Sequence, residues 1–238
     1  YTATYTCSNC TLTTKSPTGN TIYLGGGGLG PWLILDGSRV TSPAANSART
    51  IYVNFAGIVY RATAGRIELR NGTVVTGATD DPAGVDNGVI HVNGMDMFIT
   101  GSYVTNTGLG WTIITGMYGY DNDAAYHISN SVVSSTGFGV MWNAERHGYG
   151  GACSVDNSLI TSATNNGLYM YGWHGDTDAE TDLVINNSTI LALGTNGMAI
   201  GMYDDYYGQR NLAVTNSVLH GGSWALWVSG NPVGWNSD

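Results

Sequence analysis

Hydrophobic and polar residues alternate along this chain in short stretches, separated by turns rich in Gly, Asn and Ser. Alternation with a period of two is typical of half-buried β-strands, and no stretch sustains the helical period. Examples are Met97-Phe98-Ile99, Leu183-Val184-Ile185 and Leu212-Ala213-Val214. The pattern therefore predicts an all-β protein built from many short strands.

A small polar pair precedes a strand-like stretch eight times, at nearly even spacing. Successive pairs are separated by 28, 35, 29, 29, 27, 30 and 29 residues. The pairs are Asn9-Cys10, Gly37-Ser38, Gly72-Thr73, Gly101-Ser102, Asn130-Ser131, Asn157-Ser158, Asn187-Ser188 and Asn216-Ser217. A fixed period between about 20 and 50 residues indicates a solenoid or a propeller.

The first residue of every pair is either Asn or Gly. These are the two residue types that best tolerate the left-handed backbone region, which a sharp bend between two strands requires. Each pair is therefore expected to form a left-handed corner. Stacked corners would place successive Asn side chains where they can hydrogen-bond one another.

Each repeat also contains a second strand introduced by Gly or another turn residue. Examples are Thr21-Ile22-Tyr23-Leu24, Ile51-Tyr52-Val53, Val89-Ile90-His91-Val92, Val140-Met141-Trp142, Leu168-Tyr169-Met170-Tyr171, Met198-Ala199-Ile200 and Ala225-Leu226-Trp227-Val228. Three short strands per repeat predict a parallel β-solenoid of about eight coils and about 29 residues per coil, forming one domain over residues 1–238. A propeller fits worse because each blade needs four strands. A jelly roll or β-sandwich with regularly spaced strands remains the alternative.

Composition agrees with a chain made almost entirely of strands and tight turns. Gly contributes 35 of the 238 residues, Pro only 5, and charged residues only 11%. There is no initial Met, no apolar signal stretch and no long apolar run, so we expect a mature or excised portion of a longer secreted protein without direct membrane insertion. The low charge and the Gly, Ser, Thr and Asn content favour an extracellular location.

Three cysteines are present. Cys7 and Cys10 have the spacing of a redox pair, of half a zinc site or of a small disulfide. No second Cys or His pair follows at zinc spacing and no βαβ pattern surrounds them, which favours a structural disulfide in the first coil. Cys153 lies at the start of a strand and is expected to be a buried thiol.

The net charge of −9 is unevenly distributed. Residues 1–70 contain six basic and two acidic side chains, whereas residues 71–238 contain two basic and fifteen acidic ones. A nucleic-acid partner is disfavoured because binding to phosphates requires clustered Lys and Arg. An anionic polysaccharide would be repelled along most of the solenoid unless metal ions intervened.

The long loops after the second strands combine aromatic residues with carboxylates in four consecutive repeats. Three interpretations apply: sugar binding, protein contact, or aromatic residues that simply cover strand edges while the acids keep the loops soluble. The first two make these loops a binding face. Its predicted residues are Tyr118, Tyr120, Tyr149, Trp173, Asp176, Asp178, Tyr203, Asp204, Asp205, Tyr206 and Tyr207.

A catalytic role is less well supported. Glycoside hydrolysis needs two carboxylates that face each other across roughly 5–10 Å. The loop candidates for such a pair are Glu145, Asp176, Glu180 and Asp204. A β-eliminating lyase needs a base, and only Arg146 and Arg210 are near. No calcium loop, ligand-spaced His pair, nucleophile elbow or nucleotide-binding motif is present, so no metal or cofactor is expected.

The Asn-Ser corner, followed by strands such as Gly167-Leu168-Tyr169-Met170-Tyr171, resembles the passenger domains of pertactin-like and self-associating autotransporter adhesins. The similarity is best over residues 101–230. It implies a right-handed parallel β-helix on a bacterial cell surface, active in adhesion, self-association or biofilm formation and generally not enzymatic. The coil is long for that family and no translocator barrel is present, so the chain would be a fragment of a passenger.

The sequence thus predicts an extracellular adhesive module that binds a surface glycan or protein, or another copy of itself. Two alternatives remain: a β-helical polysaccharide lyase or hydrolase, and a filament subunit that stacks end to end.

Overall fold

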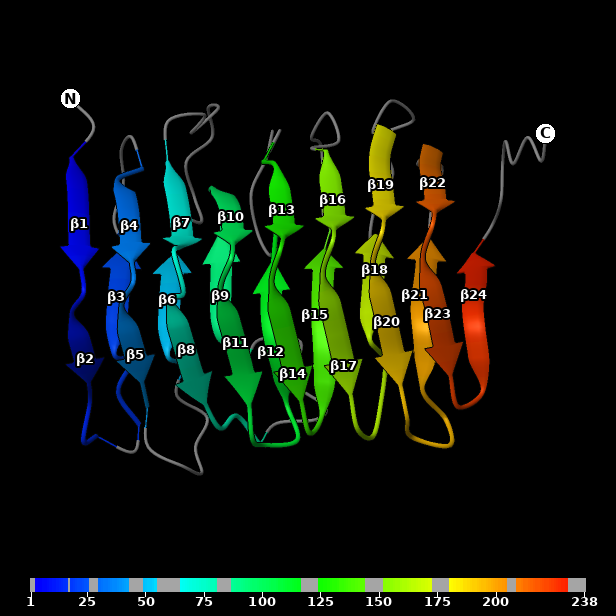
Figure 1. Cartoon of the computed structure of the whole chain (residues 1–238), viewed down its shortest axis with the longest axis horizontal. Coiled ribbons are helices and arrows are strands. Elements are labelled where there is room, and N and C mark those ends of the chain that lie inside the picture. The colour runs from blue at the N-terminus through cyan, green and yellow to red at the C-terminus, as the bar shows by residue number, and fades with distance from the viewer. Residues whose placement is uncertain are drawn as a thin grey trace.

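A computed structural model describes residues 3–16, 18–25, 30–42, 49–54, 65–80, 87–116, 124–143, 152–172, 180–204 and 209–230. Within these ranges the regular structure consists of 24 β-strands, which form three parallel sheets of eight strands each. The sheets run along the length of an elongated solenoid, with β1 at one end and β24 at the other (Figure 1).

The three sheets, named A, B and C here, receive one strand each from every coil. Sheet A contains β1 (Thr4–Ser8), β4 (Trp32–Asp36), β7 (Arg66–Arg70), β10 (Asp96–Thr100), β13 (Tyr126–Ser129), β16 (Cys153–Asp156), β19 (Glu180–Asn186) and β22 (Gln209–Thr215). Sheet B contains β2 (Thr11–Thr13), β5 (Arg39–Thr41), β8 (Val74–Gly77), β11 (Tyr103–Asn106), β14 (Val132–Ser135), β17 (Leu159–Ser162), β20 (Thr189–Ala192) and β23 (Val218–Gly221). Sheet C contains β3 (Ile22–Gly25), β6 (Ile51–Asn54), β9 (Gly88–Asn93), β12 (Trp111–Thr115), β15 (Phe138–Asn143), β18 (Leu168–Gly172), β21 (Met198–Asp204) and β24 (Trp224–Gly230).

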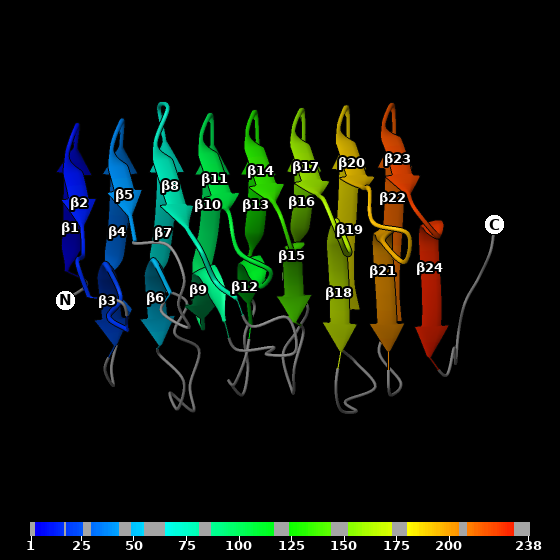
Figure 2. The ribbon, with the colours of Figure 1, turned by 90° about the horizontal axis from the view of Figure 1, so that it is seen from below.

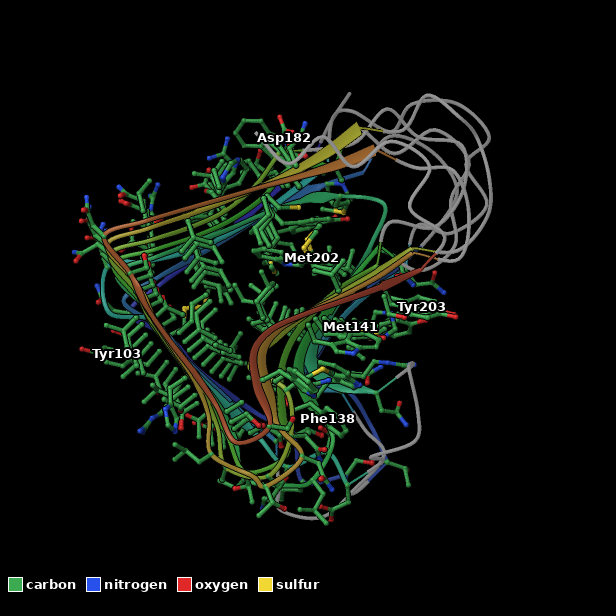
Figure 3. All side chains as sticks on the ribbon, turned by 90° about the vertical axis from the view of Figure 1, so that its right-hand side faces the viewer. Tyr103, Phe138, Met141, Asp182, Met202 and Tyr203 are labelled. Atoms are coloured by element: carbon green, nitrogen blue, oxygen red, sulfur yellow. A yellow bond between two sulfur atoms is a disulfide. The ribbon has the colours of Figure 1, made fainter. Side chains whose placement is uncertain are left out.

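The predicted parallel β-helix is confirmed, and the sandwich alternative is wrong. Every strand pairs in parallel with the equivalent strand of the next coil, as β10 does with β13. Seen from the C-terminal end, the chain runs counter-clockwise from sheet A to B to C while advancing toward the viewer, so the helix is right-handed (Figure 3). Of the eight strands in each sheet, six have a neighbour on both sides, so about six coils are fully enclosed rather than the expected eight.

Alternate residues of each strand point into the solenoid and form one continuous core. In sheet A, one inward column contains Leu35, Leu69, Ile99 and Ile128, all essentially inaccessible to solvent. Burial of such a side chain contributes about 1.5–3 kcal/mol, so the stacked columns stabilise the inner coils. Comparable columns in the first and last coils are partly exposed, since a neighbour covers them on one side only.

The corner between sheets A and B has the predicted left-handed backbone in all eight coils. The first residue of each pair has φ between 44° and 77°. The prediction that the Asn side chains bond along the axis holds for one pair among the described corners, where Asn157 Nδ2 donates to Asn130 Oδ1 at 2.7 Å. The corner is therefore defined mainly by its backbone conformation.

In most pairs the second residue is Ser or Thr, and its hydroxyl group links neighbouring coils. The backbone N–H of Ser131 donates to Ser158 Oγ, and that of Ser158 donates to Ser188 Oγ, both at 3.1 Å. Each serine hydroxyl in turn donates to the carbonyl oxygen two residues earlier, as Ser158 Oγ does to Asp156 O at 2.7 Å. The same N–H···Oγ bonds join Cys10 to Ser38, Ser38 to Thr73, Ser102 to Ser131 and Ser188 to Ser217. We call this row of bonds the serine ladder.

One rung of the serine ladder is missing, between Thr73 and Ser102. The third corner holds an additional residue, so that Asn71 and Gly72 both have positive φ. The N–H of Thr73 consequently donates to Arg70 O within its own turn, at 3.2 Å. The coils on the two sides of this corner remain joined by the sheets but not by the serine ladder.

The cysteine predictions are confirmed. Cys7 and Cys10 form a disulfide that joins the end of β1 to the start of the next strand. Cys153 lies outside any disulfide and is buried at the start of β16, where it faces the core.

Candidate functional site

Most of the predicted binding face lies outside the described residues. Tyr203 is the member of that set whose side chain the structure describes, and Asp204 is described only as the backbone end of β21. The members outside the described ranges are Tyr118, Tyr120, Tyr149, Trp173, Asp176, Asp178, Asp205, Tyr206 and Tyr207. Of the proposed catalytic loop residues, Glu145 and Arg146 are also outside, while Glu180 and Arg210 belong to strands.

The described strands nevertheless show where these loops join the solenoid. Strands of sheet C end, and strands of sheet A begin, along the same edge of the solenoid (Figure 2). The undescribed segments 117–123, 144–151, 173–179 and 205–208 each connect a sheet C strand to the following sheet A strand. Their attachment points therefore follow one another along the axis, as the stacked repeats predict.

An aromatic row lies on the outer face of sheet C beside these attachment points. The ring centroids of Tyr171 and Tyr203 are 5.5 Å apart, and those of Tyr203 and Trp227 are 6.4 Å apart. Tyr169 extends the row, with its centroid 6.3 Å from that of Tyr171. Each of the four side chains is half-buried. Tyr203 points away from the sheet (Figure 3).

The orientation of these rings determines what they can contact. The planes of Tyr171 and Tyr203 differ by 6°, and those of Tyr203 and Trp227 by 4°. Parallel stacked rings direct much of their faces toward one another and leave edges and polar groups for a partner. The geometry suits protein contact better than stacking of sugar rings on aromatic faces.

Next to the aromatic row, a second apolar cluster covers the middle of sheet C. Ile114 and Met141 point outward from the solenoid and yet are buried, packed with Trp111 and the half-buried Phe138 and Tyr169. The rings of Trp111 and Phe138 stack at 4.5 Å. The sequence pattern missed this cluster because alternation predicts which side chains face outward but not which outward ones become covered.

At the N-terminal end of sheet C the outer face is polar. Arg49 Nε donates to His91 Nδ1 at 2.9 Å, which places the ring proton on Nε2, and Nε2 then donates to Asn93 Oδ1 at 3.1 Å. The guanidinium of Arg49 also lies 4.0 Å from the ring centroid of Tyr52. His91 is thus a neutral imidazole with both ring nitrogens hydrogen-bonded, which is typical of a structural histidine.

The outer face of sheet A has a charged and aromatic cluster that the sequence did not indicate. The Arg66 guanidinium lies 3.8 Å from the ring centroid of Phe98, and its Nε lies 2.6 Å from Glu68 Oε1. Arg70 pairs with Glu68 and, through Nε at 2.9 Å, with Asp36. These charges compensate one another across two neighbouring coils. Hydrogen bonds from Asn71 and Arg70 accordingly lower the pKa of the exposed Asp36 carboxyl.

Further along sheet A, one acid and one base have pKa values shifted by burial. Burial raises the pKa of Asp96, although its carboxylate accepts the N–H of Ala125 at 2.8 Å. Burial lowers the pKa of His127, whose ring stacks on Phe98 and whose Nδ1 lies 2.6 Å from Ser154 Oγ. Such a pair is a feature of acid–base sites, but ordinary packing also produces it.

A shallow hollow of about 420 Å³ lies along the corner between sheets A and B. It extends over three coils and lies on the opposite side of the solenoid from sheet C. The lining residues are Asn130, Ser131, Val132, Asn157, Ser158, Leu159, Asn187 and Thr189. None of them was predicted as a site residue, because the Asn-Ser pairs were interpreted only as corners.

Comparison with models of known protein families, with curated proteins and with solved structures found no match. The resemblance to autotransporter passengers is therefore supported as far as the β-helix and no further. Among the described residues, no helix is long and apolar enough to cross a membrane. The described part of the chain also contains no group of three His, Cys, Asp or Glu side chains arranged to hold a metal ion.

Proposed function

We propose that this chain is an adhesive β-helix module, displayed outside the cell, that contacts a partner protein through the outer edge of sheet C. The observation that carries the proposal is the aromatic row of Tyr169, Tyr171, Tyr203 and Trp227. It lies on a regular parallel sheet, beside the corner where the loops rich in Tyr, Trp and carboxylates are attached.

Physical chemistry supports a protein surface as the partner. Tyr and Trp are enriched among the residues that dominate protein interfaces, since a large rigid ring is buried at little cost in entropy. A rigid solenoid holds such rings at one coil spacing, about 4.8 Å, so little conformational entropy is lost on binding. The partner surface can belong to another protein or to a second copy of this chain.

Beads coated with the chain provide a direct test. Attachment to immobilised extracellular-matrix proteins and to beads carrying the same chain is measured for the wild type and for a Tyr171→Ser/Tyr203→Ser variant. Each anchor contributes about 1–2 kcal/mol, so the double change is expected to lower affinity at least tenfold. Tyr23→Ser is the matched control, because Tyr23 lies on the same outer face at the other end of sheet C.

Three results decide the matter. Loss of attachment in the double variant, with the control unchanged, supports the proposal. A wild type that attaches to none of these surfaces, or equal losses in variant and control, overturns it.

A second variant with Tyr203, Tyr206, Tyr207 and Trp173 changed to Ser extends the test to the loops. Unchanged adhesion of that variant together with polysaccharide cleavage contradicts the proposal.

A polysaccharide hydrolase or lyase is the second candidate, favoured by the raised pKa of Asp96 next to His127 on sheet A. In that case Asp96 is the proton donor. The nearby Glu68 is a poor second carboxylate because Arg66 and Arg70 neutralise it. Release of reducing sugar that Asp96→Asn abolishes would establish this activity, and adhesion without any release would exclude it.

A further inference from the structure

The hollow on the A–B corner has one polar side and one apolar side. Its polar side consists of the amides of Asn130, Asn157 and Asn187. Its apolar side consists of Val132 and Leu159, which occupy register positions next to each other on the outer face of sheet B. The lining residues carry no charge, although the chain as a whole is strongly acidic.

Tyr103 continues the apolar side by one coil. It is the register partner of Val132, and its side chain is 52% exposed. It points outward from sheet B (Figure 3). Unlike the aromatic row on sheet C, its ring stacks on no other ring among the described residues, and its neighbours in register are the aliphatic Val74 and Val132. From Tyr103 to Thr189 the strip covers three coil steps, about 14 Å at 4.8 Å per coil.

The amides of the hollow keep unused hydrogen-bonding groups. Among the described residues, their one recorded side-chain hydrogen bond is that from Asn157 Nδ2 to Asn130 Oδ1. That leaves the amide donors of Asn130, the acceptor of Asn157 and the whole amide of Asn187 available to a ligand. The left-handed corner repeats in each coil, so the three Asn residues follow one another along the axis, one per coil.

We propose that this strip, from Tyr103 to Thr189, is a binding site for an uncharged oligosaccharide that lies along the solenoid axis. A pyranose ring has an apolar C–H face and a rim of hydroxyl groups. The Tyr103 ring and the Val132 and Leu159 side chains match the face, while the amides donate to and accept from the rim. This site is separate from the aromatic row of sheet C and does not rest on the proposed function.

The chemistry of the strip argues against charged ligands. It offers no cation for a phosphate, a uronate or an acidic peptide, and the net charge of −9 repels such groups. Transfer of an uncharged glycan from water to a row of amides costs little free energy, because each hydroxyl group that leaves water regains a hydrogen bond. A repeating polymer also suits a site whose groups recur once per coil.

Affinity gel electrophoresis tests the site with named polymers. The chain is run through native gels that contain dextran, mannan, xylan, galactan or mixed-linkage glucan, with polygalacturonate as the anionic comparison. We expect at least one neutral polymer to retard the wild type and polygalacturonate to leave it unretarded. Tyr103→Ser and Asn187→Gly should each weaken that binding about fivefold to tenfold.

Each variant has a matched control. Tyr23→Ser removes an equally exposed tyrosine, 58% accessible, from sheet C. Asn216→Gly makes the same change at the last corner, outside the hollow, and glycine accepts the left-handed backbone at both corners. Binding lost with Tyr103→Ser and Asn187→Gly but kept in both controls supports the site.

Three outcomes overturn it: no retardation by any neutral polymer, retardation by polygalacturonate alone, or equal effects in variants and controls. Analytical sedimentation at increasing protein concentration tests whether a second copy of the chain occupies the strip instead of a saccharide. If the wild type dimerises and Tyr103→Ser abolishes the dimer without affecting retardation, the strip is occupied by a second copy and the saccharide site is wrong. Failure here leaves the bead assay on sheet C unaffected, so the two proposals fail independently.

Discussion

Removal of a single hydroxyl from the serine ladder should destabilise the chain measurably. In Ser158→Ala the N–H of Ser131 loses its acceptor, which lies 3.1 Å away, and Asp156 O loses its donor at 2.7 Å. Both Ser131 and Ser158 are buried, so water cannot readily replace the missing oxygen. An unsatisfied buried N–H costs about 1–3 kcal/mol, and we therefore expect the free energy of unfolding to fall by about 2 kcal/mol.

Ser134→Ala is the matched control for this experiment. Ser134 lies in β14, the strand that begins directly after Ser131. Its side chain points outward, is half-buried and forms no hydrogen bond with a described residue. Its replacement should change stability by less than about 0.5 kcal/mol. Urea unfolding measures both variants, and hydrogen exchange of the Ser131 amide reports on the rung itself.

The expected result is a lower midpoint and faster exchange at Ser131 in Ser158→Ala only. Equal midpoints for the two variants, with the Ser131 amide still protected, would refute the role assigned to the serine ladder. In that case the sheets alone would hold the corner in place.

Four further predictions concern the corners, the pH response of two residues and the core. Asn157→Ala should lower the free energy of unfolding by about 1–2 kcal/mol because alanine disfavours a φ near 44°, whereas Asn157→Gly should change it little. Urea unfolding of both variants measures the difference. His127 holds its proton less tightly when folded, so stability falls as the pH drops below about 6.5, and His127→Gln should flatten that decline in thermal unfolding. Asp96 holds its proton more tightly when folded, so it destabilises the fold as the pH rises above about 4, and Asp96→Asn should remove this trend. Ile128→Ala should lower the unfolding free energy by about 2–5 kcal/mol, and a smaller loss in urea would mean that the core collapses around the gap.

The sequence was sufficient for the solenoid because its local requirements repeat. A left-handed corner accepts few residue types, so Asn9, Gly37 and their equivalents mark the same bend in every coil. Alternation then assigns each side chain to the inside or the outside of the coil. Neither inference needs long-range contacts, since both depend on backbone sterics and on the period of a strand.

Contacts between coils were harder to predict. The hydroxyls of Ser131 and Ser158 bond across the stack, and this depends on how closely one corner lies above the next. For the aromatic row, the sequence selected Tyr203 but placed Tyr171 only in a strand, although alternation leaves both on the outer face of sheet C. The cluster around Arg66 was missed because its contacts with Phe98 and those of Arg70 with Asp36 cross to neighbouring coils, and alternation does not show which outward side chains bond across that step.

The extra residue at the third corner has a mechanical consequence. Because the rung between Thr73 and Ser102 is missing, the third corner is joined to the fourth by the sheets and by the bond from the Gly72 N–H to Gly101 O, but by no hydroxyl group. If the solenoid is pulled from its ends, this corner should separate before the corners that also carry a rung, while the bonds between Asn106 and Thr79 still join the same two coils at the far end of sheet B. We expect the opening of a rod under load to begin at the third corner, with three coils on one side and five on the other.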